Sequence, residues 1–156
     1  MKISEFEFRP DNHFVAMEYY WLILNRTFLI LITDKDLIGI KVHGPIGVES
    51  HDSLMSLLPL TIDGDLQNPY SYMSMKYIER IKDADLKSND FLKINSSNFR
   101  INKSDIIETT YDKTKKWGMG PYPHDGKVYV RTRDDNKREF IILGAQSGQG
   151  IKNSLS

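Results

Sequence analysis

The chain has 156 residues, of which 40% are hydrophobic and 27% charged, a composition typical of one soluble globular domain rather than of a disordered segment. Its 21 Lys and Arg residues balance 21 Asp and Glu residues, and this zero formal charge argues against a dedicated nucleic-acid-binding protein. The absence of cysteine excludes disulfides, thiolate metal sites and a cysteine nucleophile, and it fits a reducing, cytoplasmic location.

Charge is unevenly divided along the chain. Residues 1–70 carry five basic and ten acidic side chains, whereas residues 71–156 carry sixteen and eleven. A basic face in the C-terminal half is one expectation, and an ordinary solvated surface is the other. The opening MKISEFEF lacks the apolar core of a secretory signal, and Asn25 and Arg26 interrupt the apolar stretch 19–32, so we expect no signal and no transmembrane helix.

The first half predicts a group of strands. Residues 3–9 predict a weak strand, and the aromatic-rich residues 14–24 predict a second one. Residues 28–32 (FLILI) are an unbroken apolar run, as in a buried strand. After a polar turn at 34–36, residues 38–43 (IGIKVH) alternate with a period of two, which predicts a hairpin with one dry face and one wet face.

Residues 45–94 predict a helical insertion. A short helical turn is expected at 52–58, before Pro59. Asn68-Pro69 predicts the start of a longer helix, because a capping side chain is followed by proline at the first helical position. Apolar residues at three- and four-residue spacing continue this helix to about residues 88–90.

The second half predicts further strands and a closing helix. Residues 98–111 are strand-like, and residues 127–133 (KVYVRTR) alternate with Val128 and Val130 inward. A turn at 134–137 leads into residues 138–143 (REFIIL) as the returning strand. Residues 144–156 predict a short C-terminal helix.

No catalytic constellation is evident. The sequence has neither a phosphate-binding glycine loop before a helix nor a Gly-x-Ser-x-Gly motif. Its four histidines are scattered without metal-ligand spacing: His13, His43, His51 and His124. We therefore expect no catalytic residue, no metal and no cofactor, although the pattern leaves an enzymatic function open.

The loop 112–126 (DKTKKWGMGPYPHDG) carries the candidate binding residues. Lysines beside a tryptophan suit anionic lipid headgroups, and exposed aromatic residues equally suit a protein partner. A structural alternative is that Trp117 packs back over the sheet edge while the lysines stay in water. The candidates are Lys113, Lys115, Lys116, Trp117, Tyr122 and His124.

The order of elements resembles the pleckstrin-homology-like superfamily, in particular its bacterial members. The resemblance covers residues 25–44 and 95–156, with Thr33-Asp34-Lys35 in the first hairpin and Ser104-Asp105-Ile106 before the last strands. It implies one domain over residues 1–156. The fold expected is a mainly β (α+β) one, a bent antiparallel sheet or partly open barrel with a helical insertion at about 45–94 and a short C-terminal helix.

The same resemblance implies a non-catalytic interaction scaffold. Our first expectation is a cytoplasmic domain that binds a protein partner or associates with itself. An alternative is peripheral binding to an anionic membrane surface through the basic, aromatic loop, although the alternating basic residues of lipid-binding members are not matched in the first hairpin. A third expectation is a small-ligand-binding barrel or hydrolase that uses His124 or His51.

Overall fold

The structure is a computed structural model that describes residues 1–47 and 64–156. The predicted helical turn at 52–58 and His51 lie outside the described residues. The described elements, in chain order, are η1 (Ile3–Glu5), β1 (His13–Trp21), β2 (Leu24–Ile32), β3 (Asp36–His43), η3 (Pro69–Tyr72), α1 (Met75–Ile81), α2 (Asn89–Ile94), β4 (Phe99–Asn102), η4 (Lys103–Asp105), β5 (Ile106–Asp112), β6 (His124–Thr132), β7 (Lys137–Leu143) and α3 (Gly148–Leu155).

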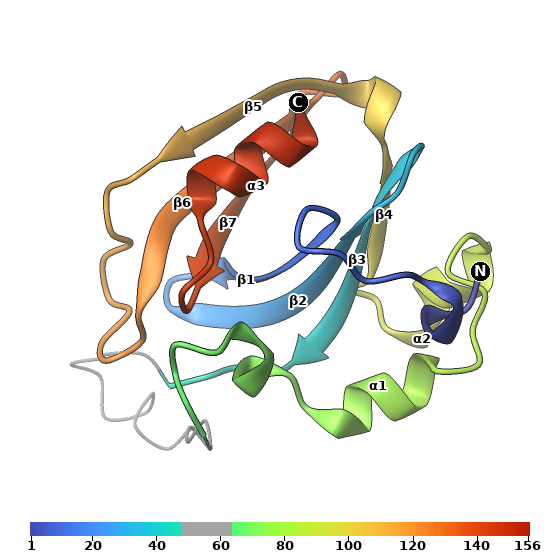
Figure 1. Ribbon diagram of the computed structural model, residues 1–156, viewed down its shortest axis with the longest axis horizontal. Helices are drawn as coiled ribbons and strands as arrows, with labels where there is room; N and C mark the ends of the chain where they lie inside the picture. The colour runs from blue at the N-terminus through green and yellow to red at the C-terminus, as the bar shows by residue number, and fades with distance from the viewer. Residues whose placement is uncertain (48–63) are drawn as a thin grey trace.

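Seven strands form one antiparallel sheet in the order β4-β3-β2-β1-β7-β6-β5. The pairing of β1 with β7 joins the N-terminal and C-terminal strands into this single sheet. Figure 1 shows the sheet strongly curved, with β4 and β5 as its two edges. The prediction of a mainly β fold with a bent antiparallel sheet and a short C-terminal helix is therefore confirmed.

In the middle strands β1, β2, β3 and β7 both faces of the sheet are buried, and each face has its own apolar core. We call one the α3 face, because α3 packs against it, and the other the insertion face, because residues 64–94 cover it (Figure 1). The α3 face includes Phe14, Phe28, Val128, Phe140 and Leu155. The insertion face includes Met17, Leu29, Ile141, Tyr72 and Phe91.

The prediction of a wet face on β3 is wrong. Gly39, on the face expected to be wet, is buried against the ring of Phe99 in β4. Leu37 is fully buried on that same face, while Lys41 and His43 are only half exposed. An alternating sequence pattern does not distinguish a face that is exposed to solvent from a face that is covered by a large side chain of another strand.

Two predictions of local structure are also wrong. Residues 3–9 contain the short 3-10 helix η1 instead of a strand. The single helix expected from Asn68 to about residues 88–90 is replaced by the separate elements η3 and α1, and α2 begins only where the expected helix was to end. Asn68 does cap its helix by accepting from the N–H of Tyr70, but Ser74 is extended and donates its backbone N–H to the carbonyl of Val42 at 2.7 Å. Attachment to β3 at this point overrides the helical periodicity.

Where strand pairing ends, two side-chain amides form hydrogen bonds with backbone groups that no neighbouring strand of the described residues reaches. Asn25 is fully buried and accepts from the N–H of Ile46 at 2.9 Å while donating to its carbonyl at 2.7 Å. Gln146 forms the same pair of bonds with Val15 at 2.9 and 2.7 Å. These contacts satisfy buried backbone groups that would otherwise cost about 1–3 kcal/mol each.

Candidate functional site

The loop between β5 and β6 is anchored by two of its own side chains. Met119 and Tyr122 are buried in the core of the insertion face, where the hydroxyl of Tyr19 donates to the sulfur of Met119 at 3.3 Å. The ring of Tyr122 meets that of Tyr72 edge-on, with 5.9 Å between the centroids. Tyr122, predicted as a binding residue, is therefore a buried anchor with 7% of its surface exposed.

His124 fixes the same loop through both of its ring nitrogens. Although it was expected in the loop 112–126, it is the first residue of β6 and is 7% exposed. Its Nε2 accepts from the backbone N–H of Lys116 at 2.9 Å, so its Nδ1 carries the proton and donates to the carbonyl of Tyr122 at 3.1 Å. The ammonium of Lys115 also donates to the carbonyl of His124.

Burial lowers the pKa of His124, and the nearby charges of Lys115 and Lys127 lower it further, while the bond to Tyr122 acts in the opposite direction. Below the ordinary pKa of 6.5, the unfolded chain then binds more protons than the folded one. The stability that neutral His124 contributes is therefore present above pH 6.5 and is lost as the pH falls.

We predict that the melting temperature falls between pH 7 and pH 5 and that most of this dependence disappears in His124→Ala. Protonated Nε2 cannot accept from Lys116, so acid weakens the attachment of the loop. Thermal melts of both proteins over this pH range measure the effect. An unchanged slope in the variant would contradict the role given to His124.

The charged candidates of this loop have different environments. The ammonium of Lys116 pairs with the carboxylate of Glu139 at 2.5 Å and lies 5.2 Å from the ring centroid of Tyr19. Lys113 and Lys115 are exposed. Trp117 is 76% exposed, so its ring does not pack over the sheet edge. The structural alternative, which required that packing, is therefore wrong.

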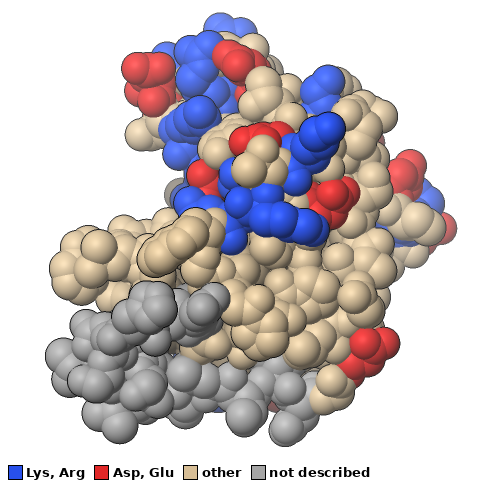
Figure 2. Space-filling view, turned by 90° about the vertical axis from the view of Figure 1, so that its left-hand side faces the viewer, with Lys and Arg blue, Asp and Glu red and all other residues tan. Residues whose placement is uncertain are grey.

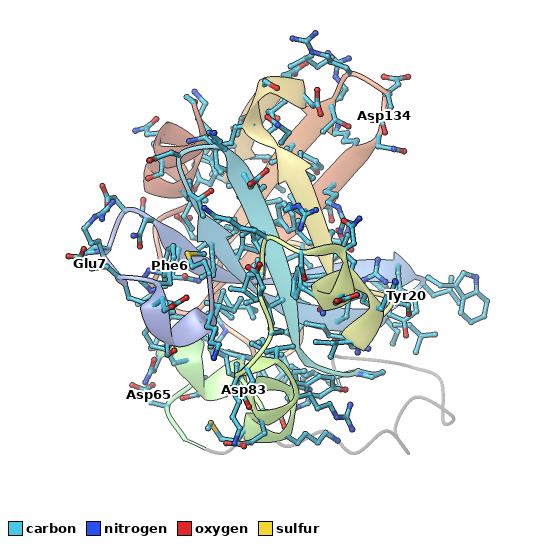
Figure 3. All side chains as sticks on the ribbon, turned by 90° about the vertical axis from the view of Figure 1, so that its right-hand side faces the viewer. Phe6, Glu7, Tyr20, Asp65, Asp83 and Asp134 are labelled. Atoms are coloured by element: carbon cyan, nitrogen blue, oxygen red, sulfur yellow. The ribbon has the colours of Figure 1, made fainter. Side chains whose placement is uncertain are left out.

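Sequence reasoning missed a second exposed apolar group at the turn between β1 and β2. We call Tyr20, Trp21 and Leu22 the hairpin tip; their exposed fractions are 49%, 65% and 74%. Figure 3 labels Tyr20 at the side of the molecule from which this tip projects. The aromatic run 19–21 was visible in the sequence, but no pattern showed that the strand would end in solvent there.

The backbone of the hairpin tip is strained. Trp21 pairs with Leu24, which leaves a two-residue turn, and Leu22 has a φ of +49° within it. This left-handed conformation favours Gly or Asn, because Cβ crowds the following carbonyl oxygen and raises the energy by roughly 1–2 kcal/mol. A large apolar side chain is thus held in water at a position where it destabilises the fold.

An open groove of about 1000 Å³ lies beside the hairpin tip. The ladder between β1 and β7 contains only Ala16–Ile142 and Met17–Ile141, so the end of β1 and the start of β7 are not paired. The groove extends from this gap to β4 and to the turn between β6 and β7, with Tyr20 and Asp134 among its lining residues (Figure 3). Figure 2, which views the molecule from the side opposite to that of Figure 3, shows Lys and Arg side chains gathered in the upper half of the surface.

Two arginines share one carboxylate in the groove. Glu18, which is 6% exposed, accepts from Arg26 at 2.8 Å and from Arg138 at 3.0 Å. The guanidinium carbon of Arg138 lies 3.8 Å from the ring centroid of Phe99. Desolvation by burial lowers the pKa of Arg138; the charge of Glu18 acts against this shift and the charge of Arg26 acts with it. Because the two guanidiniums share the single carboxylate of Glu18, this cluster has one positive charge without a matching carboxylate.

Among residues 1–47 and 64–156, no group of three or more His, Cys, Asp or Glu side chains is placed to hold a metal ion. Every helix in the same residues is too short or too polar to cross a membrane. In comparisons with known proteins, no family model, no curated protein and no solved structure matches this chain.

Proposed function

We propose that this protein is a non-catalytic interaction domain of the pleckstrin-homology-like type that binds a protein partner through the hairpin tip and the neighbouring loop 113–123. The strand order and the C-terminal helix support this fold class. The observation that carries the function is the solvent exposure of Trp21 and Leu22 at the turn between β1 and β2 and of Trp117 in the loop between β5 and β6. Tryptophan is enriched among the residues that contribute most to protein interfaces.

The strain at Leu22 supports the same proposal. A backbone outlier that persists at a cost in stability often marks a functional position. Because Lys116 contacts Tyr19, the loop that bears Trp117 meets the hairpin that bears Trp21 and Leu22. The two elements together provide the exposed aromatic side chains Trp21 and Trp117, which suit a partner that has apolar groups.

Leu22→Gly is predicted to raise stability and weaken binding. Glycine relieves the left-handed strain, for an expected gain of about 1 kcal/mol and a melting temperature higher by roughly 2–4 °C. Thermal melts measure the gain. The variant should also retain less partner than the original chain, since the exposed apolar side chain is gone; a loss of stability would contradict the assignment of strain.

Capture of a partner by the tagged, full-length chain tests the proposed function. Soluble and membrane fractions of the source organism are kept apart, and Trp21→Ala and Trp117→Ala are compared with Met75→Ala. Met75 is a matched control because it lies on α1 and is 66% exposed. Loss of one soluble protein in both tryptophan variants but not in the control is the expected result; equal capture by all four proteins would overturn the proposal.

A second candidate function is peripheral binding to anionic lipid. It is favoured by the exposure of Trp117 beside the exposed Lys113 and Lys115, since tryptophan and lysine suit the membrane interface. This function predicts that the chain is retained on anionic vesicles and is released by salt. The same capture experiment separates it from the first, because retention would then occur only with the membrane fraction.

A further inference from the structure

The free edge of β4 lines the groove. All four of its residues, Phe99–Asn102, contribute to the lining. Because successive side chains of a strand point to opposite faces, a groove that reaches four consecutive residues runs along the edge of the strand and not along one face. Among residues 1–47 and 64–156, β4 ends the sheet at this side, so within this part of the chain no strand neighbours its outer backbone groups.

The phase of the ladder shows which backbone groups face the groove. Asp36 pairs with Asn102, and the next pair is bonded through the N–H of Lys103 and the carbonyl of Lys35 at 2.7 Å. Bonded and non-bonded pairs alternate in an antiparallel ladder. The N–H and C=O groups of Phe99 and Ile101 therefore point to β3, and those of Arg100 and Asn102 point to the groove.

The side chains around this edge carry an excess of positive charge. The groove is lined by four carboxylates, Glu18, Asp105, Asp134 and Glu139, and by six cationic residues, Arg26, Arg100, Lys116, Arg133, Lys137 and Arg138. Glu18 is shared by two arginines, and Glu139 pairs with Lys116. Within the described residues, Arg133 and Lys137 are exposed and form no ion pair with a carboxylate.

We propose that the groove binds an extended, acidic segment of a protein partner, which adds to the free edge of β4 as a further strand. The backbone groups of Arg100 and Asn102 would bond the added segment, and acidic side chains would meet Arg133, Lys137 and the arginine pair at Glu18. Four residues of β4 span about 13 Å, and a groove of about 1000 Å³ has room for a short extended chain along them. This inference rests on the proposed function, because it names the partner chemistry at the same end of the molecule.

The test uses fluorescence anisotropy of a labelled peptide of alternating glutamate and valine with the full chain. Two further peptides of the same sequence carry N-methyl groups on alternate amides in the two possible phases, one on the odd-numbered and one on the even-numbered residues. In each of them, strand pairing is blocked along one edge of the peptide. Arg133→Glu, Lys137→Glu is the test variant. Arg9→Glu, Lys76→Glu is its charge-matched control, since both residues are exposed and lie outside the groove lining.

We expect the parent peptide to bind, one methylation phase to weaken binding at least tenfold, and the test variant to weaken it at least tenfold while the control does not. Absence of peptide binding, or equal binding by both methylated phases and the parent, would overturn strand addition. Inorganic phosphate and vesicles with anionic lipid are tested as competitors. If either displaces the labelled peptide at a lower concentration than unlabelled peptide does, the groove is a simple anion site, and strand addition is overturned. If strand addition fails in one of these ways but Trp21→Ala still loses partner capture, the proposed function stands. Failure of this inference can therefore be distinguished from failure of the proposed function.

Discussion

Gly39→Val should strongly lower the stability of this protein, because residue 39 is buried in β3. A Cβ atom at residue 39 would lie 2.0 Å from Cε1 of Phe99, far inside the contact distance of two carbon atoms. The ring cannot move away freely, because it is packed against Phe28, Phe140 and Arg138. Overpacking of this kind costs typically 1–3 kcal/mol, so we expect a loss of about 3 kcal/mol and a melting temperature lower by roughly 10 °C.

A double-mutant cycle and a control locate the cause. If the clash with Phe99 is responsible, Phe99→Ala should cost less in the Gly39→Val background than in the original chain. Gly150→Ala is the matched control: its added Cβ would lie 3.4 Å from Oγ of Ser147, and alanine favours the helix by roughly 0.5–1 kcal/mol. Denaturant unfolding measures the four proteins of the cycle and the Gly150→Ala control. Strictly additive losses at residues 39 and 99 would contradict the steric explanation.

Glu18→Ala is the second exchange with a large expected effect. It leaves Arg26 and Arg138, whose side chains are 25% and 27% exposed, facing each other without a carboxylate. Removing one partner of a fully buried ion pair costs about 3–5 kcal/mol, and partial exposure of the arginines reduces our expectation to roughly 2–3 kcal/mol. Added sulfate should recover part of this loss, because an anion can take the place of the carboxylate between the two guanidiniums.

The control for Glu18→Ala is Glu108→Ala, which removes the ion pair between Glu108 and Arg131. Their side chains are 49% and 38% exposed, and pairs at the surface contribute little. Chemical denaturation with and without sulfate measures both variants. A loss in Glu18→Ala no greater than in Glu108→Ala, or a loss insensitive to sulfate, would contradict the account of the shared carboxylate.

The strands could be predicted from the sequence because their patterns are local. The apolar run at 28–32 lies within β2, and the alternation at 127–133 lies in β6 except for Arg133, which is in the turn after it. The closing helix lies within 144–156. The second face of β3 could not be predicted, since Gly39 is buried by Phe99, a residue sixty positions further along the chain. The helix expected from Asn68 failed for the same reason, because a backbone bond to Val42 ends it.

The candidate site was predictable only in part. The loop 112–126 was identified by its composition, and the structure exposes Trp117, Lys113 and Lys115 while it buries Tyr122 and His124. The groove could not be predicted, because its residues are far apart in the sequence: Arg26 and Arg138 meet only at Glu18 in the folded chain. Exposure of the hairpin tip depends on where β1 ends relative to the rest of the sheet, which no residue pattern specifies.

The two tryptophans of the chain provide the most direct measurement of the central claim, because both lie in the proposed binding surface: Trp21 is 65% and Trp117 76% exposed. The chain is labelled with 5-fluorotryptophan, its two ¹⁹F resonances are assigned with Trp21→Phe, and spectra are recorded in buffer and in unlabelled soluble extract of the source organism. Anionic vesicles are added in a separate sample. The account predicts that both resonances shift or broaden in the soluble extract and that an excess of unlabelled chain reverses the change. Resonances that stay unchanged in the extract, or that respond to vesicles alone, would contradict it.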